Sequence, residues 1–307
     1  MRILFAGSPE VALPSLGALL ATDHTLCGVV SQPARPVGRS KTLTPTAVAA
    51  FATENHLPLA TPDSVEGLLE AVTSFRPEVA VVVAYGRILS PELLASLPRG
   101  WWNVHFSLLP RWRGAAPVQH AILEGDTVTG VTLFKIVPEL DAGPIASSVS
   151  VDIEPLDSQG SLLERMSSLA APLVVDLVYR LHGGDIALLD QQGEATFAPK
   201  FQKRAGALRL TEPAEVLDRR IRALTPEPGA KVLRADNDVS IGIVSAELVT
   251  NVERIAPGEL RYSHGLVLLG TGTTPLVLNV VQPAGKKPMP AGDWYRGLPQ
   301  GVVIHAT

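Results

Sequence analysis

The feature that most constrains the fold is the continuous apolar run Val79–Tyr85, which reads Val-Ala-Val-Val-Val-Ala-Tyr. A strand with one face in water alternates apolar and polar residues, whereas this run has no charged or amide side chain on either face. It is too short for an ordinary helix, and Gly86 follows it directly. The run therefore predicts a central strand of a mostly parallel sheet that helices cover on both faces.

Segments on both sides of this run alternate between apolar strands and amphipathic helices. The alternation begins with a strand at 2–6, and Ser8 is expected to cap a helix in which Leu13, Leu16 and Leu19 recur at helical spacing. This order is typical of a Rossmann-like α/β fold, in which ligands bind beyond the carboxyl ends of the strands. Further strands are expected at 26–31, 58–60, 101–106, 131–137 and 146–153, and helices at 46–56, 64–74, 90–97, 117–123 and 158–182.

The pattern changes at about residue 185, where the periodicity fades into a segment expected to be a linker. A short helix is expected at 213–224, followed by short β-rich segments at a spacing typical of a small barrel or sandwich. We therefore predict two domains, a Rossmann-like α/β domain at 1–205 and a C-terminal β domain at 206–307. The β-rich segments are 230–235, 239–248, 258–262, 265–269 and 276–282.

The composition, with 46% hydrophobic and 18% charged residues, is typical of a soluble protein with a substantial core. No apolar run approaches the roughly 18 residues that cross a bilayer, and the first residues are expected to form a strand rather than a signal peptide. The single cysteine, Cys27, cannot form an internal disulfide, which favours a reducing cytoplasm.

The net charge of −4 is unevenly distributed along the chain. Residues 1–203 hold 14 basic and 20 acidic residues, whereas residues 204–307 hold 12 and 10. An acidic first part joined to a slightly basic second part allows a local basic surface despite the total charge. A non-enzymatic RNA-binding protein would be strongly basic with clustered aromatic residues, which 5% aromatics and a negative net charge do not fit.

Two polar residues, Asn103 and His105, stand in the apolar strand predicted at 101–106. Because they are two positions apart, their side chains point to the same face of a strand. Asp141, before Gly143, also follows a predicted strand, so the three can converge on one crevice. An amide and an imidazole can donate to the oxyanion of acyl transfer, and a carboxylate can hold the imidazole or remove a proton from an attacking amine. Each residue alone is more often structural, and physical reasoning leaves both interpretations open.

Other kinds of site are not indicated by the sequence. The chain has no G-x-G-x-x-G dinucleotide motif, no G-x-S-x-G nucleophile motif and no Cys/His spacing typical of a metal site. Cys27 lies in an apolar strand, where a nucleophilic thiolate is disfavoured.

The segment 32–45 contains Arg35, Arg39 and Lys41, three prolines and no acidic residue. Its composition fits a solvated surface loop. Connections of this length inside a compact α/β domain are uncommon, however, and tend to be functional or disordered. Three cations without a counter-charge would suit a phosphate backbone, so both interpretations stay open.

Several motifs together resemble the 10-formyltetrahydrofolate-dependent formyltransferases. The most specific is Asn103-Val-His-Phe-Ser-Leu-Leu-Pro-Arg-Trp-Arg-Gly-Ala-Ala-Pro117, which contains the Asn-x-His-x-Ser-Leu-Leu-Pro signature of that family. The other motifs extend the likeness over nearly the whole chain: Phe5-Ala-Gly-Ser-Pro9, Gln32-Pro-Ala-Arg-Pro-Val-Gly-Arg39, Val83-Ala-Tyr-Gly86, Gly130-Val-Thr132, Leu140-Asp-Ala-Gly143 and Val281-Gln-Pro-Ala-Gly-Lys-Lys287.

The resemblance implies an enzyme that transfers the formyl group of 10-formyltetrahydrofolate to a free amine without a metal. It implies that Asn103, His105 and Asp141 are catalytic and that the second domain is an OB-like barrel that binds tRNA. The basic loop and the Gln-Pro-Ala-Gly-Lys-Lys run favour initiator methionyl-tRNA as the acceptor. The resemblance also implies folate contacts from Ser107, Leu108, Leu109, Pro110, Tyr85 and Gly86, and tRNA contacts from Arg35, Arg39, Lys41, Lys286 and Lys287.

Two other acceptors stay open within this resemblance, an amino-sugar nucleotide and glycinamide ribonucleotide. Formyltransferases that act on glycinamide ribonucleotide would have no C-terminal β domain, whereas those acting on amino-sugar nucleotides share more of the chain. The sequence departs from the expected pattern at Phe106, where a small residue is expected, and in having a single lysine after Arg39. We expect a cytoplasmic monomer that binds no membrane.

Overall fold

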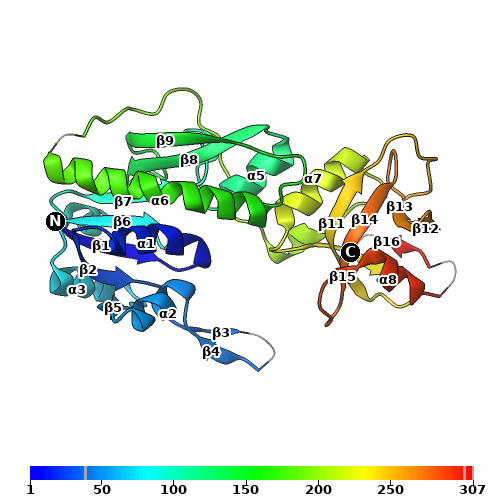
Figure 1. Cartoon of the computed structure of the whole chain (residues 1–307), viewed down its shortest axis with the longest axis horizontal. Helices are drawn as coiled ribbons and strands as arrows, with labels where there is room; N and C mark the ends of the chain where they lie inside the picture. The colour runs from blue at the N-terminus through cyan, green and yellow to red at the C-terminus, as the bar shows by residue number, and fades with distance from the viewer. Residues whose placement is uncertain (38–39, 185, 300–301, 306–307) are drawn as a thin grey trace. The chain divides into compact units, whose positions relative to one another are not determined.

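The structure is a computed structural model that describes residues 1–37, 40–184, 186–299 and 302–305. It divides the chain into two compact units, coloured along the chain in Figure 1. The end of the first unit includes most of the segment after 185 that the sequence predicts to be a linker. The first unit comprises Met1–Gly114, Val128–Asp152 and Leu163–Phe197, and the second comprises Ala115–Thr127, Ile153–Leu162 and Ala198–Thr307.

The first unit is built on a seven-stranded sheet in the order β5-β2-β1-β6-β7-β8-β9. The first five strands of this order run parallel, and β8 pairs antiparallel with both β7 and β9. Every residue of β6 is buried, as expected for a strand covered on both faces. The mostly parallel sheet confirms the predicted fold class. The strands are β1 (Arg2–Gly7), β2 (Thr25–Val30), β5 (Leu59–Ala60), β6 (Val79–Val83), β7 (Trp101–His105), β8 (Val128–Lys135) and β9 (Ile145–Asp152).

Helices lie along this sheet, and Figure 1 shows α1 and α6 on the side facing the viewer. Three of the helix starts are fixed by hydroxyl caps, because Thr46, Ser64 and Ser90 each accept the backbone N–H three residues further on. The elements are η1 (Glu10–Ala12), α1 (Leu13–Leu20), α2 (Ala47–Glu54), α3 (Val65–Phe75), α4 (Pro91–Ala95) and α6 (Gln159–Gly183).

The predicted loop at 32–45 contains a short β-hairpin. Its strands β3 (Arg35–Val37) and β4 (Thr42–Thr44) pair antiparallel, and all of their residues are exposed. The apolar side chains of Val37 and Leu43 are 56% and 69% exposed. Because both faces of the hairpin meet water, the sequence has no apolar alternation that would mark these strands.

The second unit is built on an antiparallel sheet in the order β12-β13-β14-β11-β10-β16, with β15 also paired to β14. The two ends of this order meet, because Glu259 bridges to Val303 and the N–H of Ile304 donates to the carbonyl of Gly258 at 2.9 Å. The sheet therefore closes into a barrel, which confirms the predicted C-terminal β-barrel domain. Its strands are β10 (Ala230–Arg234), β11 (Ser240–Leu248), β12 (Leu260–Ser263), β13 (Leu266–Leu269), β14 (Leu276–Pro283), β15 (Met289–Pro290) and β16 (Ile304–His305).

Helices of the second unit cover the barrel and its flank. Leu217 and Ile221 of α7 and Trp294 of α8 belong to one buried cluster with residues of the barrel strands. Each aliphatic side chain buried in this way contributes roughly 1.5–3 kcal/mol of transfer free energy. The helices are α5 (Pro117–Glu124), η2 (Lys203–Gly206), α7 (Ala214–Leu224) and α8 (Ala291–Arg296).

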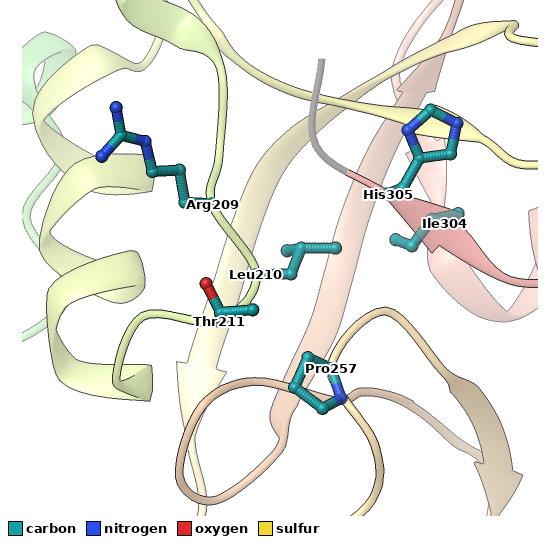
Figure 2. Close-up of a pocket in the computed structure, with 6 residues that line it drawn as sticks. All are labelled: Arg209, Leu210, Thr211, Pro257, Ile304 and His305. Atoms are coloured by element: carbon teal, nitrogen blue, oxygen red, sulfur yellow. The ribbon is translucent and has the colours of Figure 1, made fainter.

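A hollow of about 250 Å³ lies beside the closure of the barrel (Figure 2). Leu210, Pro257 and Ile304 form part of its lining, and the guanidinium of Arg209 extends away from Leu210. No residue predicted to bind folate or tRNA lines it, and we assign no role to this hollow.

Two properties of the described residues bear on the expectations about membranes and metals. None of their helices is both long enough and apolar enough to span a membrane. The same residues hold no group of three or more His, Cys, Asp or Glu side chains that could bind a metal ion.

Candidate active site

Asn103 and His105 lie on β7, which separates the parallel strand β6 from the antiparallel strand β8. In the sheet, Asn103 pairs with Phe134 and His105 pairs with Thr132. His105 is 5% exposed, whereas Asn103 is half-buried. Within the part of the chain that the structure describes, no group hydrogen-bonds the side-chain amide of Asn103. Its N–H donors are therefore available to a ligand.

The imidazole of His105 is hydrogen-bonded at Nε2 and faces a carboxylate with Nδ1. Nε2 lies 2.8 Å from the carbonyl oxygen of Trp112, and Nδ1 lies 3.8 Å from Oδ2 of Asp141. Because a carbonyl oxygen only accepts, the first contact assigns the hydrogen of the neutral ring to Nε2. Nδ1 then carries a lone pair on the side of Asp141. It can accept a proton, and it can donate to an oxyanion only after doing so.

Burial lowers the pKa of His105 below its usual value, while the Asp141 carboxylate and the Trp112 carbonyl oppose this shift. The cause is that a buried imidazolium loses its hydration. The imidazole is therefore neutral at pH 7, which is the state in which Nδ1 can act as a base. Any imidazolium formed during a reaction is stabilised by the carboxylate beside it.

Asp141 adopts a backbone φ of +47°, a left-handed conformation that most residues avoid. Its Oδ2 accepts the N–H of Gly114 at 2.8 Å, and its backbone carbonyl accepts Nε2 of Gln191 at 2.7 Å. The carboxylate is thus hydrogen-bonded to the loop after β7 and lies beside His105. The structure brings His105 and Asp141 together, and Asn103 lies two residues before His105 on β7.

The route by which Asp141 reaches His105 differs from the prediction. From the sequence, the turn around Asp141 was expected to leave the same sheet edge as the parallel strands. However, β8 is antiparallel to β7, and Lys135 at its end pairs with Trp102 near the start of β7. The carboxyl end of β8 therefore lies where the parallel strands begin, and the turn that follows β8 runs back along the sheet to His105.

The loop Ser107–Pro110 is anchored to the strand beside His105. The hydroxyl of Thr132 donates to the carbonyl of Ser107 at 2.6 Å and accepts the N–H of Leu109 at 3.2 Å. The Ser107 hydroxyl donates to the carbonyl of Arg111 at 2.6 Å. Thr132 is buried, and its anchoring role was not predicted because threonine is an ordinary residue in a strand.

Ser8, Gln32 and Tyr85 meet where three neighbouring parallel strands end. The hydroxyl of Ser8 and Nε2 of Gln32 both donate to the carbonyl of Tyr85 at 3.2 Å. The prediction that Ser8 caps a helix is therefore wrong. Pro9 occupies the cap position of η1, and no side chain caps that start.

Apolar side chains are exposed beside the predicted folate residues. Ile88, two residues after Gly86, is 88% exposed, and Leu140, next to Asp141, is 52% exposed. A Cβ built on Gly86 would meet no atom within 4 Å. Tyr85 itself is buried. The surface after Gly86 and the surface beside Asp141 thus each expose an apolar side chain.

The described members of the predicted tRNA-binding cations lie in two places. Arg35 and Lys41 are exposed on the β3–β4 hairpin, where Arg35 contacts Oε1 of Gln32 at 3.4 Å. Arg39 lies outside the described residues. Lys286 and Lys287 are exposed in the turn between β14 and β15 of the second unit.

This arrangement can catalyse acyl transfer to an amine. A free amide N–H can donate to an oxyanion, a neutral imidazole can remove a proton, and a carboxylate stabilises the charge that results. The fold and the site together suit an enzyme that transfers an acyl group to an amine and carries a C-terminal barrel.

Family comparisons agree with this class over both parts of the chain. The family described as "Formyl transferase" matches residues 1–178, and the family described as "Formyl transferase, C-terminal domain" matches residues 200–299. The chain belongs to the formyl transferase family.

Curated relatives match along almost the full length. A protein of Acidothermus cellulolyticus named methionyl-tRNA formyltransferase is 44% identical over 315 residues, which covers 97% of each chain. A protein of Corynebacterium glutamicum with the same name is 41% identical over 306 residues, again covering 97% of each chain.

Solved structures show the same fold at low identity. HypX from Aquifex aeolicus in complex with tetrahydrofolic acid has a TM-score of 0.69 at 16% identity, with 96% of this chain and 46% of that chain covered. The N-formyltransferase from Helicobacter canadensis in complex with folinic acid and dTDP-3-aminofucose has a TM-score of 0.68 at 18% identity, with 92% and 99% covered.

Proposed function

We propose that the protein transfers the formyl group of 10-formyltetrahydrofolate to the free amine of initiator methionyl-tRNA. The observation that carries this proposal is identity of 41–44% to methionyl-tRNA formyltransferases across both the catalytic part and the barrel. The catalytic groups also fit, since Asn103, His105 and Asp141 supply the donor, the base and the counter-charge that transfer to an amine requires.

In the proposed mechanism, the amine nitrogen attacks the formyl carbon and its carbonyl oxygen becomes an oxyanion. The amide of Asn103 donates to that oxygen from the start of the step. Nδ1 of His105 takes the proton that the amine releases, and Asp141 stabilises the imidazolium. His105 then donates this proton as the bond from the formyl carbon to the donor nitrogen breaks, which restores the neutral ring.

The residues present fit a folate. A flat heteroaromatic ring needs apolar surface beside polar groups. Ile88, two residues after Gly86, and Leu140, next to Asp141, supply exposed apolar surface. We propose that Ser107, Leu108, Leu109, Pro110, Tyr85 and Gly86 line this site, with Tyr85 acting through its backbone. When bound, 10-formyltetrahydrofolate supplies the formyl group.

We infer that the exposed cations contact tRNA phosphates. Arg35 and Lys41 have no carboxylate partner among the described residues, which suits contact with a phosphate backbone. Lys286 and Lys287 supply two further exposed cations from the barrel. We include Arg39 in this set by its place in the sequence, and we propose that the enzyme acts as a monomer in the cytoplasm.

One assay separates the possible acceptors. The protein is incubated with 10-formyltetrahydrofolate and with charged initiator tRNA, glycinamide ribonucleotide or an amino-sugar nucleotide in parallel reactions. We expect formylation of the charged tRNA at a kcat/KM far above that of the other two. Preferential formylation of the sugar nucleotide or of glycinamide ribonucleotide would overturn the choice of acceptor while leaving the formyl transfer itself intact.

A further inference from the structure

Gln191 lies in the segment after residue 185, and its side-chain amide connects two loops of the candidate active site. Nε2 donates to the carbonyl oxygens of Asp141 at 2.7 Å and of Gly143 at 2.9 Å. Oε1 accepts from Arg113, at 3.1 Å from Nε and 2.7 Å from Nη2. Two donors and two acceptor positions are the full capacity of a glutamine amide. Every hydrogen-bonding position of this side chain is therefore used.

Arg113 fixes which way this amide points. Its guanidinium can only donate, so the amide oxygen must face it and the amide N–H groups must face the turn. Arg113 is itself held, because its backbone N–H donates to the carbonyl of Thr196 at 2.8 Å and Nη1 lies 3.2 Å from Glu139. The guanidinium, the amide and the turn thus form one chain of contacts.

The turn at Asp141 needs such support. Its left-handed φ of +47° costs free energy, and such conformations persist only where surrounding contacts hold them. Two backbone carbonyls of this turn are bonded by the same amide, one on each side of Ala142. The placement of the Asp141 carboxylate beside His105 follows from the placement of this turn.

We propose that Gln191 is a positioning residue that holds Asp141 in its reactive place, with Arg113 orienting the Gln191 amide. This inference rests on the proposed formyl transfer. Gln191 does not contact the reacting atoms in this role. It acts through Asp141, so its loss lowers turnover rather than the affinity for substrate.

The sharpest variant is Gln191→Glu, which changes one NH2 group to oxygen. A glutamate keeps an acceptor for Arg113 but has no N–H to give to the two carbonyls, and its negative charge repels their oxygens. The chain offers a matched control in Gln192→Glu, because Gln192 is exposed and its amide contacts only the carbonyl of Asp190, at 3.4 Å, among the described residues.

The experiment measures kcat and KM for formylation of charged initiator tRNA by full-length variants. We expect Gln191→Glu to lower kcat by roughly 10- to 100-fold, the effect of misplacing a catalytic group by about an ångström, with KM changed less than about threefold. Gln192→Glu should keep the parent kcat. Gln191→Met, which adds no charge, should also lower kcat by at least about tenfold.

A double-mutant cycle then tests whether Gln191 acts through Asp141. Asp141→Asn removes the carboxylate while keeping a residue that tolerates the left-handed backbone. In the Asp141→Asn background, Gln191→Met should lower kcat by no more than about twofold, because the group it positions is already gone. A full additional loss in that background would show a general structural effect and would overturn the proposal.

The outcomes separate this inference from the function on which it rests. A parent enzyme that formylates no amine refutes the proposed function. An active parent whose Gln191→Glu and Gln191→Met variants retain the parent kcat refutes the positioning role alone. Thermal unfolding of each variant is measured in parallel, and a kcat loss at an unchanged unfolding midpoint supports positioning.

Discussion

The loop after β7 and the hairpin β3–β4 are both short segments with prolines, a glycine and arginines, but their surroundings are opposite. In the loop, the backbone carbonyl of Trp112 accepts a hydrogen bond from His105. The guanidinium of Arg113 contacts Gln191 and Glu139. In the hairpin, every described residue of both strands is exposed. The same residue types thus build a fixed site in one place and a solvated charged surface in the other.

This difference indicates that function in the two regions should respond to substitutions in two different ways. Chemistry at the loop depends on atom positions that hydrogen bonds fix, so the removal of a single group should change kcat. A charged hairpin interacts over a longer range through side chains that keep their freedom, so it should respond to net charge and to salt. Variants in the two regions should therefore differ in which kinetic quantity they change.

The largest effect is expected at the catalytic groups. His105→Ala, Asn103→Ala and Asp141→Asn should each lower kcat by roughly 10² or more, because each removes a group that acts in the transition state. KM for the charged tRNA should change much less. Asparagine is chosen at position 141 because alanine would add backbone strain at φ +47°. Near-parental turnover by folded His105→Ala would remove His105 from the mechanism.

A smaller effect, and a different one, is expected at the hairpin. Replacing Arg35, Arg39 and Lys41 with alanine should raise KM for tRNA while leaving kcat close to the parent value. The slope of log affinity against log salt should flatten by roughly 0.7–0.9 for each phosphate that the variant no longer neutralises. Stability should change by less than about 1 kcal/mol, as is usual for exposed charges.

The control for the hairpin keeps the charges and changes only the side-chain type. Arg35→Lys combined with Lys41→Arg should preserve the salt slope. If the alanine triple variant binds tRNA with the parent's affinity and slope, the hairpin is ordinary surface and the contrast between the two regions has no functional meaning.

The turn at Lys286 and Lys287 should behave as the hairpin does, with a weaker effect because it offers two cations rather than three. Lys286→Ala with Lys287→Ala should flatten the salt slope by no more than roughly 1.4–1.8, the value for two neutralised phosphates. Folate binding measured in the absence of tRNA should be unchanged. A double variant with a reduced kcat and an unchanged tRNA affinity would contradict a phosphate-binding role.

The smallest effect is expected on the pH dependence of stability. Because the pKa of His105 is lowered in the folded protein, the unfolded chain binds more protons below about pH 6.5. The free energy of unfolding should therefore fall as pH drops from about 6.5 toward the lowered pKa, and this contribution should be constant above that window. Urea unfolding of the parent and of His105→Gln at several pH values isolates this contribution. The variant should lose the part of the pH dependence of the unfolding free energy that His105 causes. Equal slopes in both proteins would show that His105 does not titrate in this way.

Much of the fold was predictable because β1, β2 and β6 in the first sheet are almost entirely apolar and buried. The run at Val79 forms β6 within two residues of its predicted end, and the strand bearing His105 ends one residue earlier than expected. The hairpin was missed because its strands bury nothing. The short helix α8 was missed because it has only six residues and lies among glycine and proline.

The candidate residues Asn103, His105 and Asp141 could be proposed from the sequence, but the contacts that support them could not. Asn103 and His105 share a strand, so their spacing alone places them on one face. Gln191 stands in a stretch without periodicity and is indistinguishable in the sequence from Gln192. Its role depends on which turn the chain passes, and only the fold supplies that information. Thr132 was missed because a threonine in a strand is ordinary and gives no sign of the loop that it anchors.

The predicted domain boundary at residue 205 stays a prediction. In the structure, α5 and α7 belong to the same compact unit, and Val118 and Ile122 of α5 are buried. A fragment that ends at 205 would therefore remove the helix against which α5 packs. We expect such a fragment to expose apolar surface at α5.

The segment at 186–197 has the composition of a spacer but is hydrogen-bonded as part of the catalytic unit. Leu189 exchanges both backbone hydrogen bonds with Ile145, at 2.9 and 2.7 Å. This matters for hybrid enzymes that combine the barrel of one relative with the catalytic part of another. A splice near residue 185 would import a foreign side chain opposite Arg113, whereas a splice after Phe197 keeps the host's own Gln191. Under the proposed positioning role, the compatibility of two parents then depends on whether the joined segment carries this amide, and not only on its length.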